Sequence, residues 1–125
     1  MDCLGLLLAV VVHPADVQDR DGAKALLRRR PELPRLAVIW ADGAYTAVVD
    51  WVLQQFGWIV TTILRPLGAK GYVHLPKRWI VERTFGWLSK SRRLCRDYEV
   101  RLDHSASMVR ICMIRLMLRR LAKVA

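Results

Sequence analysis

The sequence predicts an α/β fold with a small, mainly parallel sheet followed by C-terminal helices. Short apolar runs rich in β-branched residues alternate with amphipathic segments of helical length. This alternation is typical of parallel strands joined by helical crossovers. After the last such run, two long segments with helical spacing follow one another without another strand between them, which predicts helices at the C-terminal end.

The first expected strand comprises residues 5–13, within the apolar run LGLLLAVVV. Its end, Ala-Val-Val-Val, is β-branched, and a His-Pro turn signal follows, so a buried strand is favoured. The run is too short for a membrane span, which needs about 20 residues. A signal peptide would begin with positive charge, whereas Asp2 stands here.

The other elements follow from periodicity and from residues that favour helix ends. Asp19 or Asp21 is the expected N-terminal cap of the first helix and Ser105 that of the last, while Gly57 fits a helix C-terminus. The stretch 65–71 is expected to be a loop. We expect helices over about 21–30 (stopped by Pro31), 45–56, 77–93 and 104–123, and buried strands over 36–41 and 58–64.

The charge of the chain points to a polyanionic partner. The 125 residues, about one domain, carry a formal net charge of +10, and 54% are hydrophobic, enough for a core. Such an excess is most often matched by nucleic acid and sometimes by a membrane surface. The three cysteines form no CxxC pair, which argues against a disulfide framework and a zinc site and suits a reducing cytosol.

Two carboxylates stand at positions suited to chemistry. Asp42 ends the strand LAVIWA, and chemistry in parallel sheets gathers at the carboxyl ends of strands. Glu82 is the one acid in RWIVERTFGWLSKSRRLCR, residues 78–96, among six cations. Converging carboxylates suit a two-metal phosphoryl-transfer site, in which oxygen ligands hold Mg²⁺ and nearby cations hold the negatively charged strand.

Plainer interpretations of the same residues stay open. An Asp-Gly pair after a strand often forms a turn, and Arg78 and Glu82 have the spacing of a helix-surface ion pair. The apolar stripe of the 77–93 helix, with Val81, Phe85 and Leu88, is expected in the core. Its two tryptophans, Trp79 and Trp87, are expected to be packing anchors rather than base-stacking platforms.

Three strings, VQDRDGAKALL, IWADGAY and RWIVERTFGWLSKSRRLCRDYE, closely resemble DDE-type transposases of bacterial insertion sequences, in the insertion-sequence-five group. The likeness spans roughly residues 2–122. It implies a ribonuclease-H-like fold and cut-and-paste chemistry on DNA ends, with three acids binding two divalent metals, usually Mg²⁺. Asp42 matches the second acid and Glu82 the third. The basic residues expected to contact DNA are Lys77, Arg78, Arg83, Lys90, Arg92, Arg93 and Arg96.

The resemblance also implies a truncation. Met1-Asp2-Cys-Leu-Gly resembles a family string between the second and third strands, so the first acid, the first two strands and the N-terminal DNA-recognition region are expected to be absent. Residues 1–125 would then be one C-terminal part of a catalytic domain, a truncated ribonuclease-H-like fold of three strands. We expect it not to cleave DNA alone and to expose apolar edges and faces on LLLAVVV and LAVIW.

Several partners and origins are compatible with this interpretation. An upstream transposase half, or a second copy, would repair the site, and the chain would be either half of a frame-split enzyme or a remnant. Another hypothesis is a non-catalytic basic DNA-binding fragment that regulates transposition. A peripheral membrane protein using the basic, amphipathic last helix is a third. We expect a bacterial cytoplasmic, nucleoid-associated protein that binds insertion-sequence ends and no membrane.

Overall fold

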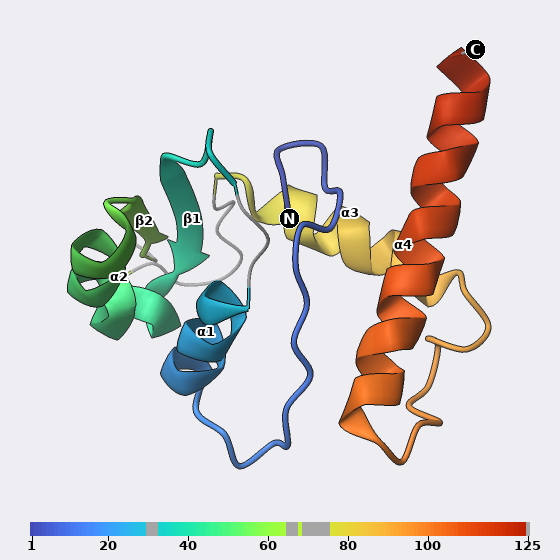
Figure 1. Ribbon diagram of the computed structural model, residues 1–125, viewed down its shortest axis with the longest axis horizontal. Helices are drawn as coiled ribbons and strands as arrows, with labels where there is room; N and C mark the ends of the chain where they lie inside the picture. The colour runs from blue at the N-terminus through green and yellow to red at the C-terminus, as the bar shows by residue number, and fades with distance from the viewer. Residues whose placement is uncertain (30–32, 65–67, 69–75, 125) are drawn as a thin grey trace. The chain divides into compact units, whose positions relative to one another are not determined.

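The computed structural model of the chain describes residues 1–29, 33–64, 68 and 76–124. It divides into two compact units, which we call the sheet unit (residues 15–78) and the helical unit (residues 1–14 and 79–125). Each unit is described by itself. In chain order, the elements are α1 (Asp19–Arg28), β1 (Val38–Asp42), the 3₁₀ helix η1 (Gly43–Val48), α2 (Val49–Phe56), β2 (Ile59–Ile63), α3 (Arg78–Ser89) and α4 (Leu102–Val124) (Figure 1).

The sheet unit is built on two parallel strands. β1 and β2 pair in a register that runs from Val38 opposite Ile59 to Asp42 opposite Ile63. η1 and α2 form the crossover between them, as parallel pairing requires. The core residues of this unit are Val48, Val52, Trp58 and Val60. The predicted α/β class with C-terminal helices is therefore confirmed.

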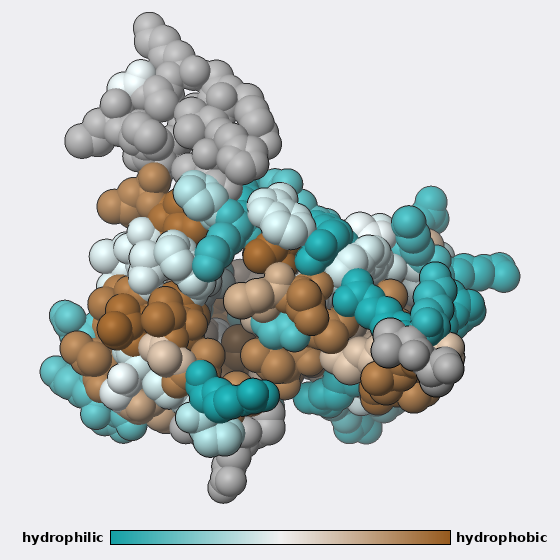
Figure 2. Space-filling view, turned by 90° about the horizontal axis from the view of Figure 1, so that it is seen from above, coloured by the Kyte–Doolittle hydropathy of each residue, from teal (hydrophilic) through white to brown (hydrophobic). Residues whose placement is uncertain are grey.

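One face of this sheet carries exposed apolar side chains. The burial of β1 alternates along the strand: Ile39 and Ala41 pack against the core, whereas Val38 and Trp40 are 41% and 46% exposed. On β2, Ile59 is 58% exposed. The exposed apolar face expected on LAVIW is thus observed, and apolar surface is visible among hydrophilic side chains in Figure 2.

The helix ends of the sheet unit agree with the sequence at one point and differ at another. Gly57 closes α2 in the left-handed region at φ 69°, and its N–H donates to Leu53 O, as expected for a helix C-terminus. The predicted cap of α1 is wrong, because Gln18 occupies the cap position. Asp19 and Asp21 lie in the first turn, where their negative charge complements the helix dipole. Pro31 and most of the expected 65–71 loop lie outside the described residues.

The strand predicted over residues 5–13 is not formed, so the described sheet has two strands instead of three. In the helical unit, two carbonyls of this segment accept hydrogen bonds from side chains rather than from a neighbouring strand. Thr84 Oγ1 donates to Gly5 O at 2.8 Å, and Arg110 Nη2 donates to Val10 O at 3.4 Å. A β-branched run without a strand partner therefore stays irregular.

The two helices of the helical unit have different bounds from those predicted. α3 ends at Ser89 instead of residue 93, because turn bonds such as Ser91 N–H to Leu88 O replace the helical pattern. α4 begins at Leu102, so Ser105 lies inside the helix and is not its cap.

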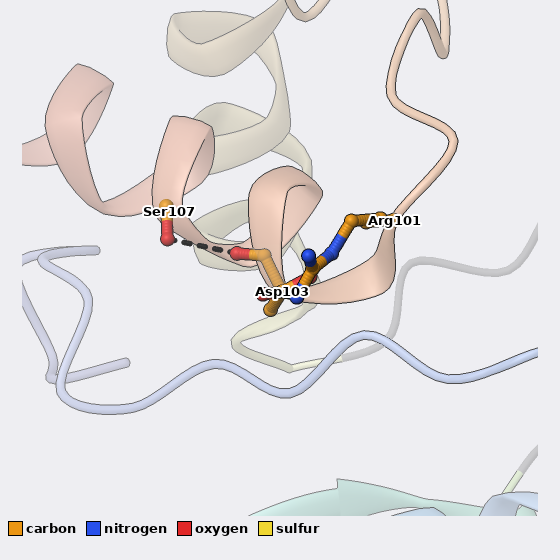
Figure 3. A network of polar contacts seen from close by, with 3 residues as sticks. All are labelled: Arg101, Asp103 and Ser107. Atoms are coloured by element: carbon orange, nitrogen blue, oxygen red, sulfur yellow. Dashed lines mark hydrogen bonds and ion pairs between the residues drawn. The ribbon is translucent and has the colours of Figure 1, made fainter.

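The first turn of α4 is held by polar contacts instead. Arg101 donates to both carboxylate oxygens of Asp103, and Ser107 Oγ donates to Asp103 O at 2.8 Å (Figure 3). Among the described residues, no helix has the length and apolar character needed to cross a membrane.

Candidate functional site

Asp42 lies where a parallel sheet presents functional groups. It is the last residue of β1, it is exposed, and by strand alternation it belongs to the same face as Trp40. Its Oδ1 accepts a hydrogen bond from Ala44 N–H at 3.1 Å, so the carboxylate also caps η1. The Asp-Gly turn and a functional carboxylate are therefore compatible here, because the cap orients the side chain.

Negative charge gathers around Tyr45, next to this strand end. Burial raises the pKa of the Tyr45 hydroxyl, and the carboxylates of Asp19 and Asp42 raise this pKa further. A wide depression of about 410 Å³ beside them is lined by Asp19, Arg20 and Ala44 among others. The start of α1 and the end of β1 thus bring two carboxylates toward one phenol within the sheet unit.

Glu82 lies on the exposed side of α3, in the helical unit. Apolar side chains lie beside it, since Val81 is 40% and Phe85 62% exposed, and the exposed Arg78 lies one turn before it. The sequence predicted that Val81 and Phe85 lie in the core, which is wrong, because the buried side of α3 is formed around Thr84. Glu82 therefore lies on an exposed side of α3 that carries both apolar side chains and a cation.

Arg83 lies between two tryptophans. Its guanidinium carbon lies 4.5 Å from the Trp79 ring centroid and 4.7 Å from that of Trp87, and its Nη2 donates to Leu4 O at 2.8 Å. Arg120 covers Trp87 at 4.3 Å. Cation–π stacking and hydrogen bonding place Arg83 in the packing of the N-terminal segment on α3. Its role in DNA binding stays a prediction.

The turn after α3 presents the other cations. Lys90, Arg92 and Arg96 are exposed. Arg93 is partly engaged, because it pairs with Glu99 and lies 5.6 Å from the Tyr98 ring. These residues belong to one short segment of the helical unit, which we call the basic turn (residues 90–96).

Lys77 belongs to the sheet unit and lies on the open sheet face. Its Nζ is 4.1 Å from the Trp40 ring centroid, and its backbone has φ 61°, a left-handed conformation that is uncommon outside glycine. Arg78, the first residue of α3, is exposed. The predicted basic residues are thus divided between the two units.

The residues that sequence reasoning missed are the polar ones that build the helical unit. Thr84 is 1% exposed and joins Gly5 to α3, and Arg120 stacks on Trp87. Gly5, at φ 79°, was one signal, since its Leu-Gly-Leu context suits a tight turn. Nothing in the spacing of Thr84 marks it as buried.

The donor chemistry at Asp42 and Glu82 suits a hard divalent cation, since both carboxylates offer oxygen and both residues are exposed. The two belong to different units. Within the described ranges, no three His, Cys, Asp or Glu side chains gather closely enough to hold a metal ion.

Comparison with known proteins gives one match. A family model described as Transposase DDE domain matches residues 1–117. No curated protein and no solved structure matches significantly. The matched range includes Asp42, Glu82 and the whole basic turn.

Proposed function

Because the chain belongs to the transposase DDE-domain family, we propose that it acts in DNA transposition at insertion-sequence ends, in the insertion-sequence-five group. Asp42 and Glu82 would be the second and third acids of the strand-cutting site. The observation that carries this is their placement: both motif carboxylates are exposed, and neither belongs to the buried core of its unit.

The two carboxylates would hold divalent metal, with Mg²⁺ as the expected ion. When bound, the metal activates the attacking oxygen and stabilises the leaving oxygen of the phosphodiester. The chain's own contribution is orientation. The Ala44 N–H fixes one oxygen of Asp42, and α3 carries Glu82. We propose that a third carboxylate from an upstream transposase half or a second copy completes the site, and that this chain alone does not cleave DNA.

The basic turn would position the DNA backbone. Lys90, Arg92 and Arg96 are exposed and close in sequence, which suits contacts to successive phosphates. Such contacts orient the duplex and carry no sequence preference of their own. Arg83 would contribute less, because its guanidinium is already stacked on Trp79 and Trp87. This function places the protein in the bacterial cytoplasm, at the nucleoid.

A second function rests on the charge. With a net charge of +10 and a cationic segment on the surface, the chain is also suited to be a non-catalytic DNA-binding fragment that occupies ends and regulates transposition. Binding would then not need either carboxylate, and it would weaken with salt at a log–log slope of about −0.9 per phosphate contacted.

One set of measurements tests both functions. Binding of a labelled duplex is measured from low to high salt for the wild type, for Asp42→Asn with Glu82→Gln, and for Arg92→Gln with Arg96→Gln. Nicking of supercoiled plasmid is measured with and without Mg²⁺. We expect binding that survives loss of the carboxylates, a salt slope reduced by about 2 when both arginines are replaced, and no nicking by the chain alone.

The matched control for the arginine pair is Arg28→Gln with Arg29→Gln, two exposed cations at the end of α1. An unchanged slope for the basic-turn variant would contradict its role in binding. Mg²⁺-dependent nicking that disappears in the carboxylate variant would show a complete site and overturn the incomplete one. Absence of duplex binding at low salt would contradict both functions.

A further inference from the structure

α4 carries two distinct apolar faces. Ala106 and Met113 face the interior of the helical unit and are 7% and 1% exposed. A second row of apolar side chains is open: Ile111 is 57%, Ile114 53%, Leu118 60% and Leu121 67% exposed. We call these four residues the α4 seam.

The spacing of the α4 seam is that of a helix-pairing surface. Steps of three, four and three residues separate its members, which is the a/d pattern of a heptad repeat. The exposed large apolar side chains form a narrow strip, as in a two-helix contact, rather than the wider apolar face of a helix that packs on a globular core.

Two of the positions beside the α4 seam are basic, and two others, Met117 at g and Ala122 at e, are apolar. Arg110 and Arg115 occupy the flanking g and e positions of the heptad, and both are exposed. Arg119 and Lys123 lie further round on the side of Arg115 and are exposed as well. Residues at e and g set partner choice through charge, so a complementary helix would carry acids beside its own apolar positions.

We propose that the α4 seam binds an amphipathic helix of another protein, with apolar residues at heptad spacing and Asp or Glu on both sides of them. Burial of the four apolar side chains drives the association, since removal of apolar surface from water is favourable. The flanking arginines select the partner by charge. This interaction is separate from the carboxylates and from the basic turn, so it stands independently of the proposed function.

A second copy of the chain fits the α4 seam poorly. A parallel pair would bring Arg110 of one copy opposite Arg115 of the other, because g and following e positions face each other. An antiparallel pair with the four apolar residues aligned would bring the two copies of Arg115 together. Either arrangement puts like charges side by side, which disfavours self-association.

Membrane and DNA also fit less well. Helices that lie on bilayers use a broad apolar face with Trp, Phe or Leu, whereas the α4 seam is a narrow row of isoleucine and leucine. Nucleic acid would contact the arginines and leave the apolar row in water. A helix with acidic flanks satisfies both the apolar and the charged features.

The test uses the full chain and a designed peptide. The probe is a fluorescein-labelled helical peptide with Leu and Ile at a and d and Glu at e and g, and the reference is the same composition in scrambled order. Anisotropy titrations give the Kd of each. We expect the patterned peptide to bind and the scrambled peptide, which has equal charge, to bind at least about tenfold more weakly.

Two variants locate the contact. Leu118→Lys places a charge in the α4 seam and is expected to weaken binding at least about tenfold. Leu53→Lys on α2 is the matched control, since Leu53 is 52% exposed and the charge change is identical. Arg115→Glu should weaken binding about three- to tenfold, and a peptide with Lys at the facing position should restore it. Circular dichroism confirms equal helicity in all variants.

Other outcomes would overturn the proposal or assign the α4 seam to a second copy of the chain or to a membrane surface. Equal binding of both peptides, or patterned binding unaffected by Leu118→Lys, would overturn the proposal. So would sedimentation that shows a dimer abolished by Leu118→Lys, which would assign the α4 seam to a second copy. Binding to vesicles with 30% anionic lipid that Leu118→Lys abolishes, without binding of the patterned peptide, would assign it to a membrane surface.

Discussion

The two units of this chain differ in how far polar contacts contribute to their interiors. The sheet unit buries Val48, Val52, Trp58 and Val60 in one apolar cluster between a two-stranded sheet and its helices. The helical unit buries Ala106 and Met113 together with the polar Thr84, and it joins its N-terminal segment to the helices through hydrogen bonds and stacked arginine and tryptophan. The first interior is apolar throughout, whereas the second combines apolar burial with individual polar contacts.

This difference bears on how each unit responds to substitution. Apolar burial is non-directional, so the stability of the sheet unit should fall when a substitution removes buried side-chain volume. Hydrogen bonds and close backbone contacts depend on direction and distance. The stability of the helical unit should therefore also fall with substitutions that change little volume but disturb these contacts. The candidate carboxylates divide between the units, and stable presentation of Asp42 and Glu82 therefore depends on both kinds of packing.

Trp58→Ala should have the largest effect. Trp58 is 8% exposed and its ring stacks on Phe56 with centroids 5.0 Å apart. Its loss should destabilise the sheet unit by about 3–5 kcal/mol. Hydrogen exchange, read by peptide, should show lost protection within residues 15–78 and retained protection in α3 and α4.

The control for this variant is Trp40→Ala, which removes the same side chain from a position that is 46% exposed. It should lower protection much less. Equal loss of protection in both units after Trp58→Ala would mean that they unfold together, and the contrast between their interiors would then have no energetic consequence.

Gly5→Ala should be the most damaging small change in the helical unit. Gly5 has φ 79°, and an added Cβ would lie 2.6 Å from Thr84 Oγ1 and 3.1 Å from Trp87 Cζ3. Backbone strain and overpacking together should cost roughly 2–4 kcal/mol. Gly57→Ala shares the positive φ, at 69°, but meets no atom within 4 Å, so about 1–2 kcal/mol is expected. Urea unfolding gives the free energy of unfolding of both variants. An equal decrease for Gly5→Ala and Gly57→Ala would contradict the close packing at Gly5.

The same contrast explains what the sequence could predict. Alternating apolar runs and the Gly57 helix end were read correctly because they reflect local propensity and pattern. Residues 5–13 have an equally strong strand pattern, but a strand also needs a neighbour. Here Thr84 and Arg110 donate instead to two carbonyls of this segment, those of Gly5 and Val10. A sequence pattern indicates the local preference for a strand, but it does not show whether a neighbouring strand is available for pairing.

The candidate site was predictable to a similar extent. The motif around Asp42 placed the carboxylate at a strand end, and the structure agrees. The sequence could not show that Arg83 would be stacked between Trp79 and Trp87, because that depends on side chains one turn away on each side and on the Leu4 carbonyl. A cation in a basic helix has the same sequence signal whether it packs or binds phosphate.

Thr84→Val should have a moderate effect that separates polarity from volume. The Thr84 hydroxyl lies 2.8 Å from Gly5 O and 2.9 Å from Ile80 O, and valine keeps the shape but removes the donor. The buried Gly5 carbonyl loses its partner, which should cost about 1–2 kcal/mol. Thr46→Val, whose hydroxyl bonds Gly43 O at an exposed position, should cost about 0.5 kcal/mol or less. If Thr84→Val and Thr46→Val lowered the free energy of unfolding equally in thermal unfolding, the hydrogen bond to Gly5 O would make no special contribution to stability.

The smallest effect is expected at the exposed start of α4. Hydrogen bonds from Arg101 lower the pKa of the Asp103 carboxyl. Because the folded pKa lies below the unfolded value of about 3.9, this contribution is present above that pH and is lost as the pH falls through the folded pKa. Asp103→Asn should remove this part of the pH dependence while leaving helicity at neutral pH nearly unchanged, since solvent screens the pair. NMR titration should show a higher Asp103 pKa in Arg101→Gln. An unchanged pKa would mean that the contact in Figure 3 does not persist in solution, and that directional polar bonds hold the helical unit only where they are buried.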